Sequence, residues 1–217
     1  MKYLALISLL AACGAPPAID AGVKELDAGM RDAGDPWADR VTLFTPGPGA
    51  GFGQDRFPAV VLGPPSGGGE SSGSTDVLSL GKNGVIELEF VDLLAIDGPG
   101  VDLLVFENGF TGFLELGVVA VSEDGVDWRT FPCAATLDAG VNGCAGTRPV
   151  YANPAQGISG TDPAVAGGDG YDLADVGLTR ARFVRVTDTG TNRFYGMPGG
   201  GFDLDALAVV NSAPVAP

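Results

Sequence analysis

The sequence contains no histidine and has little positive charge. Without an imidazole, Ser–His and Cys–His catalysis, histidine-ligated zinc and a histidine pH switch near neutrality are all excluded. Lysine and arginine together number 12 against 27 aspartates and glutamates, so the net charge is −15. This balance argues against nucleic acid as a partner, because phosphates are bound by basic side chains. The 217 residues correspond to one main domain, and 45% of them are hydrophobic, which is enough for a real core.

The N-terminus has the features of a secretory signal. A basic start precedes an apolar run over residues 3–10, and two alanines and Cys13 follow. Eight residues are too few for a membrane-spanning helix, which needs about 20. A buried N-terminal strand or helix is the alternative. Residues 10–13 (LAAC) also resemble the lipobox of bacterial lipoproteins. That resemblance implies a signal peptide over 1–12, a lipid on Cys13 and anchoring in the cell envelope, with the outer membrane favoured because glycine follows the cysteine.

Residues 13–36 predict a disordered tether. They repeat the tripeptide Asp-Ala-Gly three times and show no apolar periodicity, so they cannot bury enough surface to offset the entropy of ordering. Calcium-binding repeats are the alternative, but the aspartates are spaced more widely than a calcium loop requires. The folded domain is then expected over residues 37–211, followed by a C-terminal tail over 212–217.

The domain is predicted to be an all-β sandwich or barrel with little helix. Short apolar runs recur between clusters of Gly, Pro and Asp, and the chain holds 35 glycines and 16 prolines. Ile86 and Leu88 alternate with two glutamates, as in a strand with one solvent face. Residues 172–176 predict a helical turn with Asp172 as its N-cap. The predicted strands cover residues 59–62, 77–80, 85–91, 102–106, 117–122, 128–131, 183–187 and 203–210.

Three segments carry a resemblance to a known family. Residues 121–128 (VSEDGVDW), 181–186 (ARFVRV) and 201–207 (GFDLDAL) resemble, in that order, motifs of discoidin-type domains and related carbohydrate-binding modules of the galactose-binding-like class. Residues 62–65 (LGPP), 78–81 (LSLG) and 105–108 (VFEN), together with the last segment, are also similar to secreted bacterial cell-surface proteins. The resemblance implies a jelly-roll β-sandwich with Trp128 in its core. It implies little about chemistry, because such folds host many functions.

Acidic residues at strand ends predict a calcium site. Asp203 and Asp205 stand two apart on one strand, which places both on one face, and Glu107 and Asn108 end another core strand. Calcium takes six to eight oxygen ligands from such side chains, and related jelly rolls commonly carry a structural calcium. Two further carboxylates, Asp97 and Asp102, flank the turn at residues 98–100, which precedes the strand that ends at Glu107 and Asn108. The alternatives are simple solvation or ion pairs with Arg180, Arg182 or Arg185.

The remaining two cysteines predict a structural crosslink. With Cys13 lipidated, Cys133 and Cys144 are the thiols left in an oxidising compartment, and a catalytic thiol would lack a histidine to deprotonate it. A disulfide between them is therefore expected.

Aromatic residues in two Gly-rich loops are candidates for ligand binding. Exposed rings can stack on sugar faces, and loop tips are where such modules bind ligands, although loop aromatics also fold back over the core. The candidates are Phe110, Phe113, Phe194 and Tyr195.

Together these features predict a lipid-anchored, non-catalytic ligand-binding module, with carbohydrate as the ligand and calcium as a structural ion. An adhesive or structural surface lipoprotein with a protein partner is the alternative. A glycoside hydrolase is a more remote one, because abundant acids leave a catalytic carboxylate pair open.

Overall fold

The computed structural model describes residues 34–134, 143–192, 195–196 and 199–215. The predicted signal peptide, Cys13 and most of the predicted tether lie outside these residues. Residues 34–36 are already part of the fold: the Gly34 N–H donates to Asp92, and the carbonyl of Pro36 accepts from Val209. In the described part of the chain, no helix is both long enough and apolar enough to cross a membrane.

Alternating apolar and polar residues build the larger sheet. Ile86 and Leu88 are fully buried, whereas Glu87 points to the other face and pairs with Arg185. All pairs in the sheet are antiparallel, in the order β1–β3–β10–β6–β7. The strands are β1 (Arg40–Thr45), β3 (Val85–Glu89), β6 (Gly117–Ser122), β7 (Trp128–Thr130) and β10 (Phe183–Asp188).

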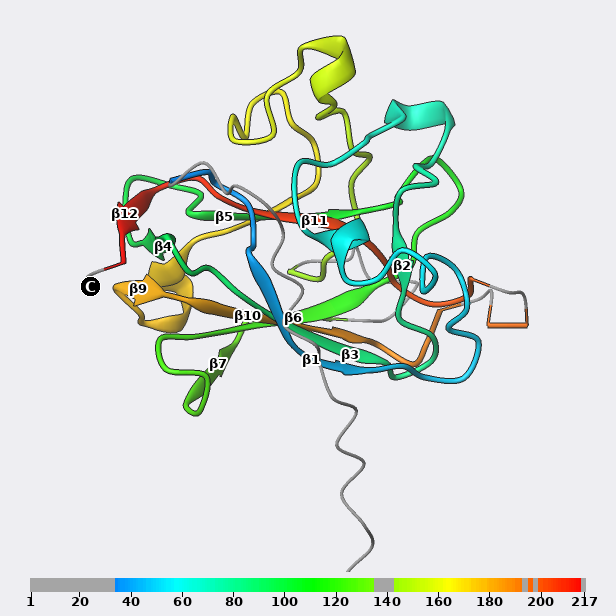
Figure 1. Ribbon diagram of the computed structural model, residues 1–217, viewed down its shortest axis with the longest axis horizontal. Helices are drawn as coiled ribbons and strands as arrows, with labels where there is room; N and C mark the ends of the chain where they lie inside the picture. Colours follow the sequence, from blue (N-terminus) through cyan, green and yellow to red (C-terminus); the bar gives the residue numbers. More distant parts are fainter. Residues whose placement is uncertain (1–33, 135–142, 193–194, 197–198, 216–217) are drawn as a thin grey trace, which may run out of the picture. The chain divides into compact units, whose positions relative to one another are not determined.

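Two further antiparallel sheets complete the described domain (Figure 1). One has the order β2–β11–β5–β8, and its strands are β2 (Leu78–Ser79), β5 (Leu103–Glu107), β8 (Asp169–Tyr171) and β11 (Asp203–Val209). The other has the order β12–β4–β9, and its strands are β4 (Leu93–Ile96), β9 (Arg180–Ala181) and β12 (Ser212–Pro214). The short 3₁₀ helices are η1 (Ala59–Val61), η2 (Gly69–Ser71), η3 (Pro154–Gln156) and η4 (Leu173–Val176).

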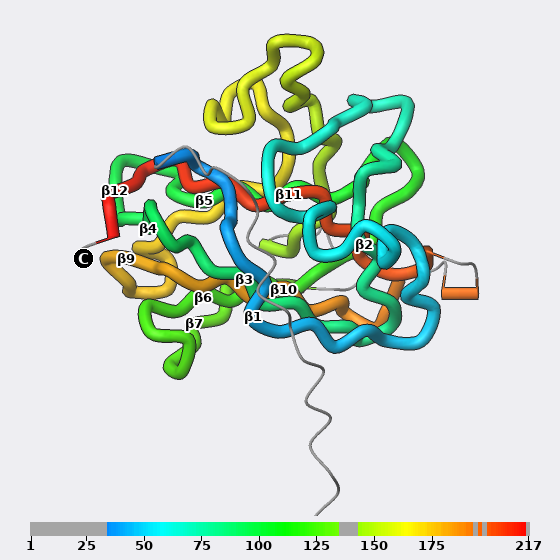
Figure 2. Tube along the Cα trace, in the orientation of Figure 1, coloured from blue at the N-terminus to red at the C-terminus, as the bar shows by residue number. Residues whose placement is uncertain are grey.

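The hydrophobic core lies between the five-stranded and four-stranded sheets, which makes the domain a β-sandwich. Side chains from β3, β6 and β10 meet those from β5 and β11, and this cluster includes Leu88, Val121, Val184, Val105 and Leu207. The other face of the four-stranded sheet is also covered: Leu104 and Phe106 pack there against Val150, Ala152 and Ala166. Because both faces of this sheet are covered, β5 consists almost entirely of apolar residues. Figure 2 shows the loops after η1 and around η3 lying side by side above β5 and β11, joined by hydrogen bonds such as Gly67 N–H to Ala152 C=O.

Several sequence predictions need correction. Residues 59–61 form η1 rather than part of a strand over 59–62, and η1 buries Val60 and Val61, whose N–H groups donate to the carbonyls of Arg56 and Pro58. Residues 212–214 belong to β12 rather than to a tail. Trp128 is half-buried on the outer face of its sheet, where the Arg185 guanidinium stacks 3.9 Å from its ring centroid, so it is not a core residue. The predicted turn at Asp172 is confirmed, since its side chain caps η4 by accepting from the Ala174 N–H.

Candidate functional site

The chain crosses from one sheet of the sandwich to the other between β5 and β6, and this crossover forms an acidic cavity. Glu107 is the last residue of β5, and Glu115 lies two residues before β6. Asp203 begins β11, and its carbonyl accepts a hydrogen bond from the Asn108 N–H at 3.2 Å. The cavity has a volume of about 180 Å³ and is lined by Glu107, Asn108, Phe110, Phe113, Glu115, Gly199 and Asp203.

Three buried oxygen atoms in this cavity accept no hydrogen bond from any described residue. They are Glu107 Oε2, Asn108 Oδ1 and Asp203 Oδ1. Among the described residues, no lysine or arginine forms an ion pair with the cavity acids. The arginines that the sequence offered as partners pair elsewhere: Arg180 with Glu123, Arg182 with Glu89 and Arg185 with Glu87. A buried acceptor without a donor costs about 1–3 kcal/mol, so three in one cavity call for a ligand that the described residues do not provide.

Other buried acids of the same domain are fully satisfied. Both oxygens of Asp188 accept hydrogen bonds, from the backbone of Asn83, Gly190 and Phe202 and from the side chains of Asn192 and Tyr195. The fold therefore supplies donors to a buried carboxylate where the carboxylate has a structural role. The missing donors are a specific property of the cavity.

Burial and mutual repulsion raise the pKa values of the cavity acids. Desolvation is the largest cause for each group, and the neighbouring carboxylates add to it. The pKa of Glu107 lies well above its ordinary value, next to Asp203 and Glu115. The pKa of Glu115 is raised to about 8 and that of Asp203 to about 7, although the nearby polar side chains of Ser79 and Asn108 act to lower the pKa of Asp203. The cavity therefore favours either protons or a cation.

Comparison with known protein families and with curated proteins finds no relative from which the role of this cavity could be inferred. No model of a known protein family matches the sequence, and no curated protein matches it significantly. The site must be interpreted from its own residues.

Two glycines let the backbone approach these side chains. A Cβ at Gly73 would lie 2.0 Å from Asn108 Oδ1, and a Cβ at Gly109 would lie 3.0 Å from Glu107 Oε2. Any other residue at position 73 would therefore push the Asn108 amide out of place. The loop after η2 and the loop after β5 are packed against the unpartnered oxygens without filling the cavity.

Of the four predicted calcium ligands, the structure brings three together. Glu107, Asn108 and Asp203 line the cavity, but Asp205 does not. The pairing of β11 with β5 is irregular between Leu204 and Ala206, which interrupts the alternation of faces. The Asp205 carboxylate instead accepts the Ser66 N–H, at 3.2 and 3.1 Å to its two oxygens.

Two of the four predicted aromatic residues also line the cavity. Phe110 and Phe113 stack with ring centroids 5.0 Å apart and an interplanar angle of 17°. Tyr195 belongs instead to the hydrogen-bond network of Asp188, to which its hydroxyl donates at 2.5 Å. Phe194 lies outside the described residues.

Asp97, Asp102 and Asp172 form a second acidic cluster, with carboxylate oxygens within 4.8 Å of one another. Its buried member already has donors: Asp102 accepts from the N–H groups of Gly98 and Leu173 and from the Asn211 amide. Asp172 caps η4. In this cluster the described residues donate hydrogen bonds to the buried carboxylate of Asp102, whereas the three buried oxygens of the cavity have no such donor.

The predicted disulfide between Cys133 and Cys144 is confirmed. It ties the segment after β7 to Ala145, which pairs with Gly117 at the start of β6. The bond therefore supports the strand next to Glu115 and takes no part in the cavity itself.

Sequence reasoning missed Glu115. This glutamate lies between Leu114 and Leu116, two residues after Phe113, and is 7% exposed. A lone acid between two leucines just before a buried strand is the available signal, because burying a carboxylate is costly unless it has a specific partner.

Proposed function

We propose that the domain is a non-catalytic binding module whose acidic cavity holds a calcium ion. The observation that carries this proposal is the set of three buried oxygens without a hydrogen-bond donor among the described residues, on Glu107, Asn108 and Asp203. Glu115 adds a further carboxylate to the same cavity. A divalent cation would satisfy all of these oxygens at once and would neutralise the repulsion between the carboxylates.

The donor set favours calcium over other metals. All the candidate ligand atoms are carboxylate or amide oxygens, which are hard donors, whereas zinc and copper sites use histidine and thiolate ligands. Calcium accepts mixed oxygen ligands in an irregular arrangement, whereas magnesium demands near-ideal octahedral geometry and retains most of its waters. The backbone of the two adjoining loops and solvent would supply the remaining positions.

The cavity supports binding better than glycoside hydrolysis. Its volume of about 180 Å³ is below the roughly 300–1,000 Å³ of pockets that enclose a small-molecule ligand. Glu107 Oε2 and Asp203 Oδ1 are fully buried, which leaves neither atom in a position to activate a solvent water.

Titration calorimetry of the full chain with calcium tests this function. We expect one ion per chain with a Kd at or below about 10⁻⁴ M, and weaker binding of magnesium. Glu107→Gln should weaken binding at least about tenfold, because an amide cannot replace a charged calcium ligand. Glu123→Gln is the matched control, since Glu123 is exposed and pairs with Arg180 away from the cavity.

Two outcomes would remove the proposal. One is the absence of calcium binding by the wild-type chain. The other is binding that survives Glu107→Gln but is lost in Asp172→Asn, which would place the ion at the second acidic cluster.

The envelope location is a separate part of the proposal, supported by the lipobox-like residues 10–13. A lipid on Cys13 would hold the domain at a bacterial outer membrane through the acidic segment that follows. Cys13→Ser should move the protein from the membrane fraction to the soluble fraction. Unchanged partition of this variant would remove the anchor.

The kinship with galactose-binding-like jelly rolls is likewise proposed. The three segments that carry the resemblance contribute the β6–β7 hairpin, β10 and β11, and β10 pairs with β6. The pairing of two of these three segments in one sheet supports a common architecture with the galactose-binding-like jelly rolls.

A further inference from the structure

The ladder between β10 and β6 ends two residues after Glu115. Asp188, the last residue of β10, pairs with Gly117, the first residue of β6. Glu115 and Leu116 precede this pair, so no residue of β10 lies opposite them. The buried backbone that carries Glu115 therefore needs hydrogen-bond partners from outside β10.

The side chain of Asn192 continues the ladder beyond the end of β10. Its Oδ1 accepts the Leu116 N–H at 2.7 Å, and its Nδ2 donates to the Leu116 carbonyl at 3.3 Å, as the backbone of a neighbouring strand would. The carbonyl has a second donor in the Thr189 N–H, whereas among the described residues the Leu116 N–H has only Asn192. Leu116 is 1% exposed and Asn192 is 7% exposed, so water has little access to replace these bonds.

Asp188 holds the Asn192 amide in this orientation. The Nδ2 of Asn192 donates to Asp188 Oδ2 at 2.6 Å, and the same oxygen accepts the Phe202 N–H at 2.9 Å. The reverse orientation of the amide would place its Oδ1 against a carboxylate oxygen, with no proton between them. Asp188 therefore directs the amide oxygen of Asn192 to the Leu116 N–H.

The same network reaches the Glu115 carboxylate from the segment before β11. Gly201, which precedes Phe202, donates its N–H to Glu115 Oε1 at 2.9 Å. Gly201 has a φ of +96°, and a Cβ there would lie 3.0 Å from Asp188 Oδ2, so this position favours glycine. Asp188 thus connects the two segments that place Glu115, the one before β6 and the one before β11.

We propose that Asn192 is a positioning residue of the calcium site, which fixes the Glu115 carboxylate in the cavity through the backbone of Leu116. This inference rests on the proposed function and extends the site beyond the side chains that line the cavity, because Asn192 does not line it. Outer partners of this kind orient the residues that bind a metal, and their loss typically weakens metal affinity about 10–100-fold.

Calorimetric titration of the full-length Asn192→Ala variant with calcium tests the inference. We expect a Kd about 10–100-fold weaker than that of the wild-type chain, measured well below the Tm of each protein. Asn211→Ala is the matched control, because the Asn211 amide also donates to a buried carboxylate, that of Asp102 at 2.7 Å, but does not line the cavity. Loss of a merely structural amide lowers the Tm without changing the Kd, so Asn211→Ala should retain the wild-type Kd.

A double-mutant cycle shows whether Asn192 acts through Glu115. Glu115→Gln alone should weaken calcium binding at least about tenfold, because an amide replaces a charged ligand. Once the carboxylate is gone, its placement no longer matters, so adding Asn192→Ala should weaken binding by less than about threefold more. Full additivity of the two losses would show that Asn192 affects the ion by another route and would overturn the inference.

The outcomes separate this inference from the function on which it rests. An unchanged Kd in folded Asn192→Ala overturns the positioning role and leaves the calcium site intact. Absence of calcium binding by the wild-type chain overturns the proposed function first, and the positioning role with it. If Asn192→Ala does not fold, Asn192→Ser takes its place, because a serine hydroxyl can still donate to Asp188 but is too short to contact both backbone groups of Leu116. The same loss of affinity is expected for this variant, and an unchanged Kd overturns the inference.

Discussion

Replacing Asp203 by asparagine should stabilise the protein in the absence of calcium. Burial raises the pKa of Asp203 from its ordinary value of 3.8 to about 7. One pKa unit corresponds to about 1.4 kcal/mol, so ionised Asp203 costs the folded state about 4 kcal/mol once the pH exceeds 7. Asparagine has the same shape without the charge. Because some hydrogen bonding is lost, we expect a net gain of about 2–4 kcal/mol at pH 8.

The direction of the pH dependence follows from the same shift. The folded-state pKa of Asp203 lies above the unfolded-state value, so the folded protein binds more protons between about pH 4 and pH 7. The free energy of unfolding of the wild-type protein in chelator should therefore fall as the pH rises through this window. Asp203→Asn lacks this titration, so the two proteins should be similar near pH 4 and diverge toward pH 8.

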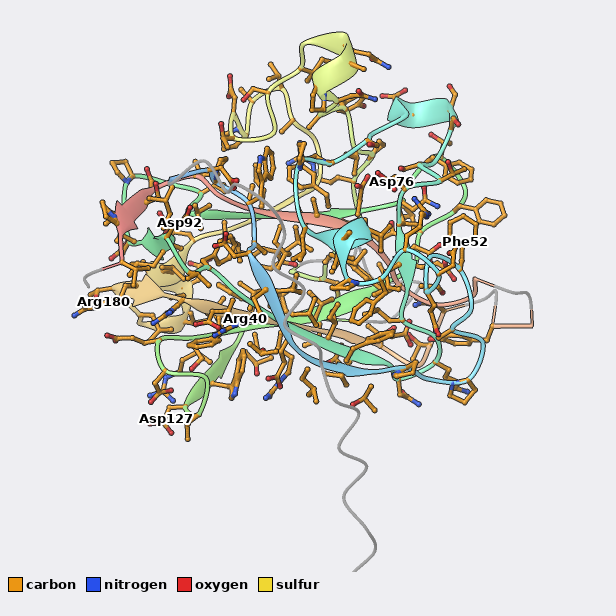
Figure 3. The ribbon with its side chains drawn as sticks, in the orientation of Figure 1. Arg40, Phe52, Asp76, Asp92, Asp127 and Arg180 are labelled. Atoms are coloured by element: carbon orange, nitrogen blue, oxygen red, sulfur yellow. A yellow bond between two sulfur atoms is a disulfide. The ribbon has the colours of Figure 1, made fainter. Side chains whose placement is uncertain are left out.

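Calcium should reverse the order of stability. At a calcium concentration of 1,000 Kd the wild-type protein gains about 4.1 kcal/mol, which matches or exceeds the advantage of about 2–4 kcal/mol that the variant has in chelator, whereas the variant lacks a charged ligand and gains little. Thermal melts in chelator and in calcium measure both effects, since 1 kcal/mol shifts the Tm of a domain of this size by about 2–4 °C. Asp127→Asn is the control, because Asp127 is exposed at the tip of the β6–β7 hairpin (Figure 3). A variant that is less stable than wild type in both conditions would refute the reasoning.

Three further predictions concern the surroundings of the cavity. Gly73→Ala should weaken calcium binding at least about tenfold in calorimetry, because the new Cβ would displace Asn108, whereas Gly51→Ala, with open space around it, should not. Replacing both Cys133 and Cys144 by serine should lower the free energy of unfolding in urea by about 3 kcal/mol, and an unchanged midpoint would contradict the structural role of the disulfide. Calcium binding at pH 7 should release about two protons, as measured by calorimetry in two buffers of different ionisation enthalpy, and release of none would show that the cavity acids are not the ligands.

Several strands with a strong apolar pattern could be predicted from the sequence, whereas the exposed edge strand β1 and the short apolar strand β4 could not. β6 has the predicted bounds, and β5 differs by one residue at each end, because both carry continuous apolar runs. β1 was missed because it lies at the edge of its sheet and exposes most of its residues. Residues 59–62 were misassigned because a four-residue apolar run fits a buried turn as well as a strand.

The candidate site could be predicted in part. Glu107, Asn108 and Asp203 were found because acids at strand ends are a local pattern. Asp205 was included because regular alternation places residues two apart on one face, and the irregular pairing after Leu204 is invisible in the sequence. Glu115 was missed because its approach to the other acids depends on the path of the chain between β5 and β6, which is a tertiary property.

A crystal structure of the full chain grown in calcium at neutral pH tests the central claim most directly. The calcium site predicts an anomalous peak in the cavity, about 2.3–2.6 Å from Glu107 Oε2, Asn108 Oδ1 and Asp203 Oδ1. A cavity filled by water or by a protein cation, or a peak at the Asp97, Asp102 and Asp172 cluster instead, would contradict it.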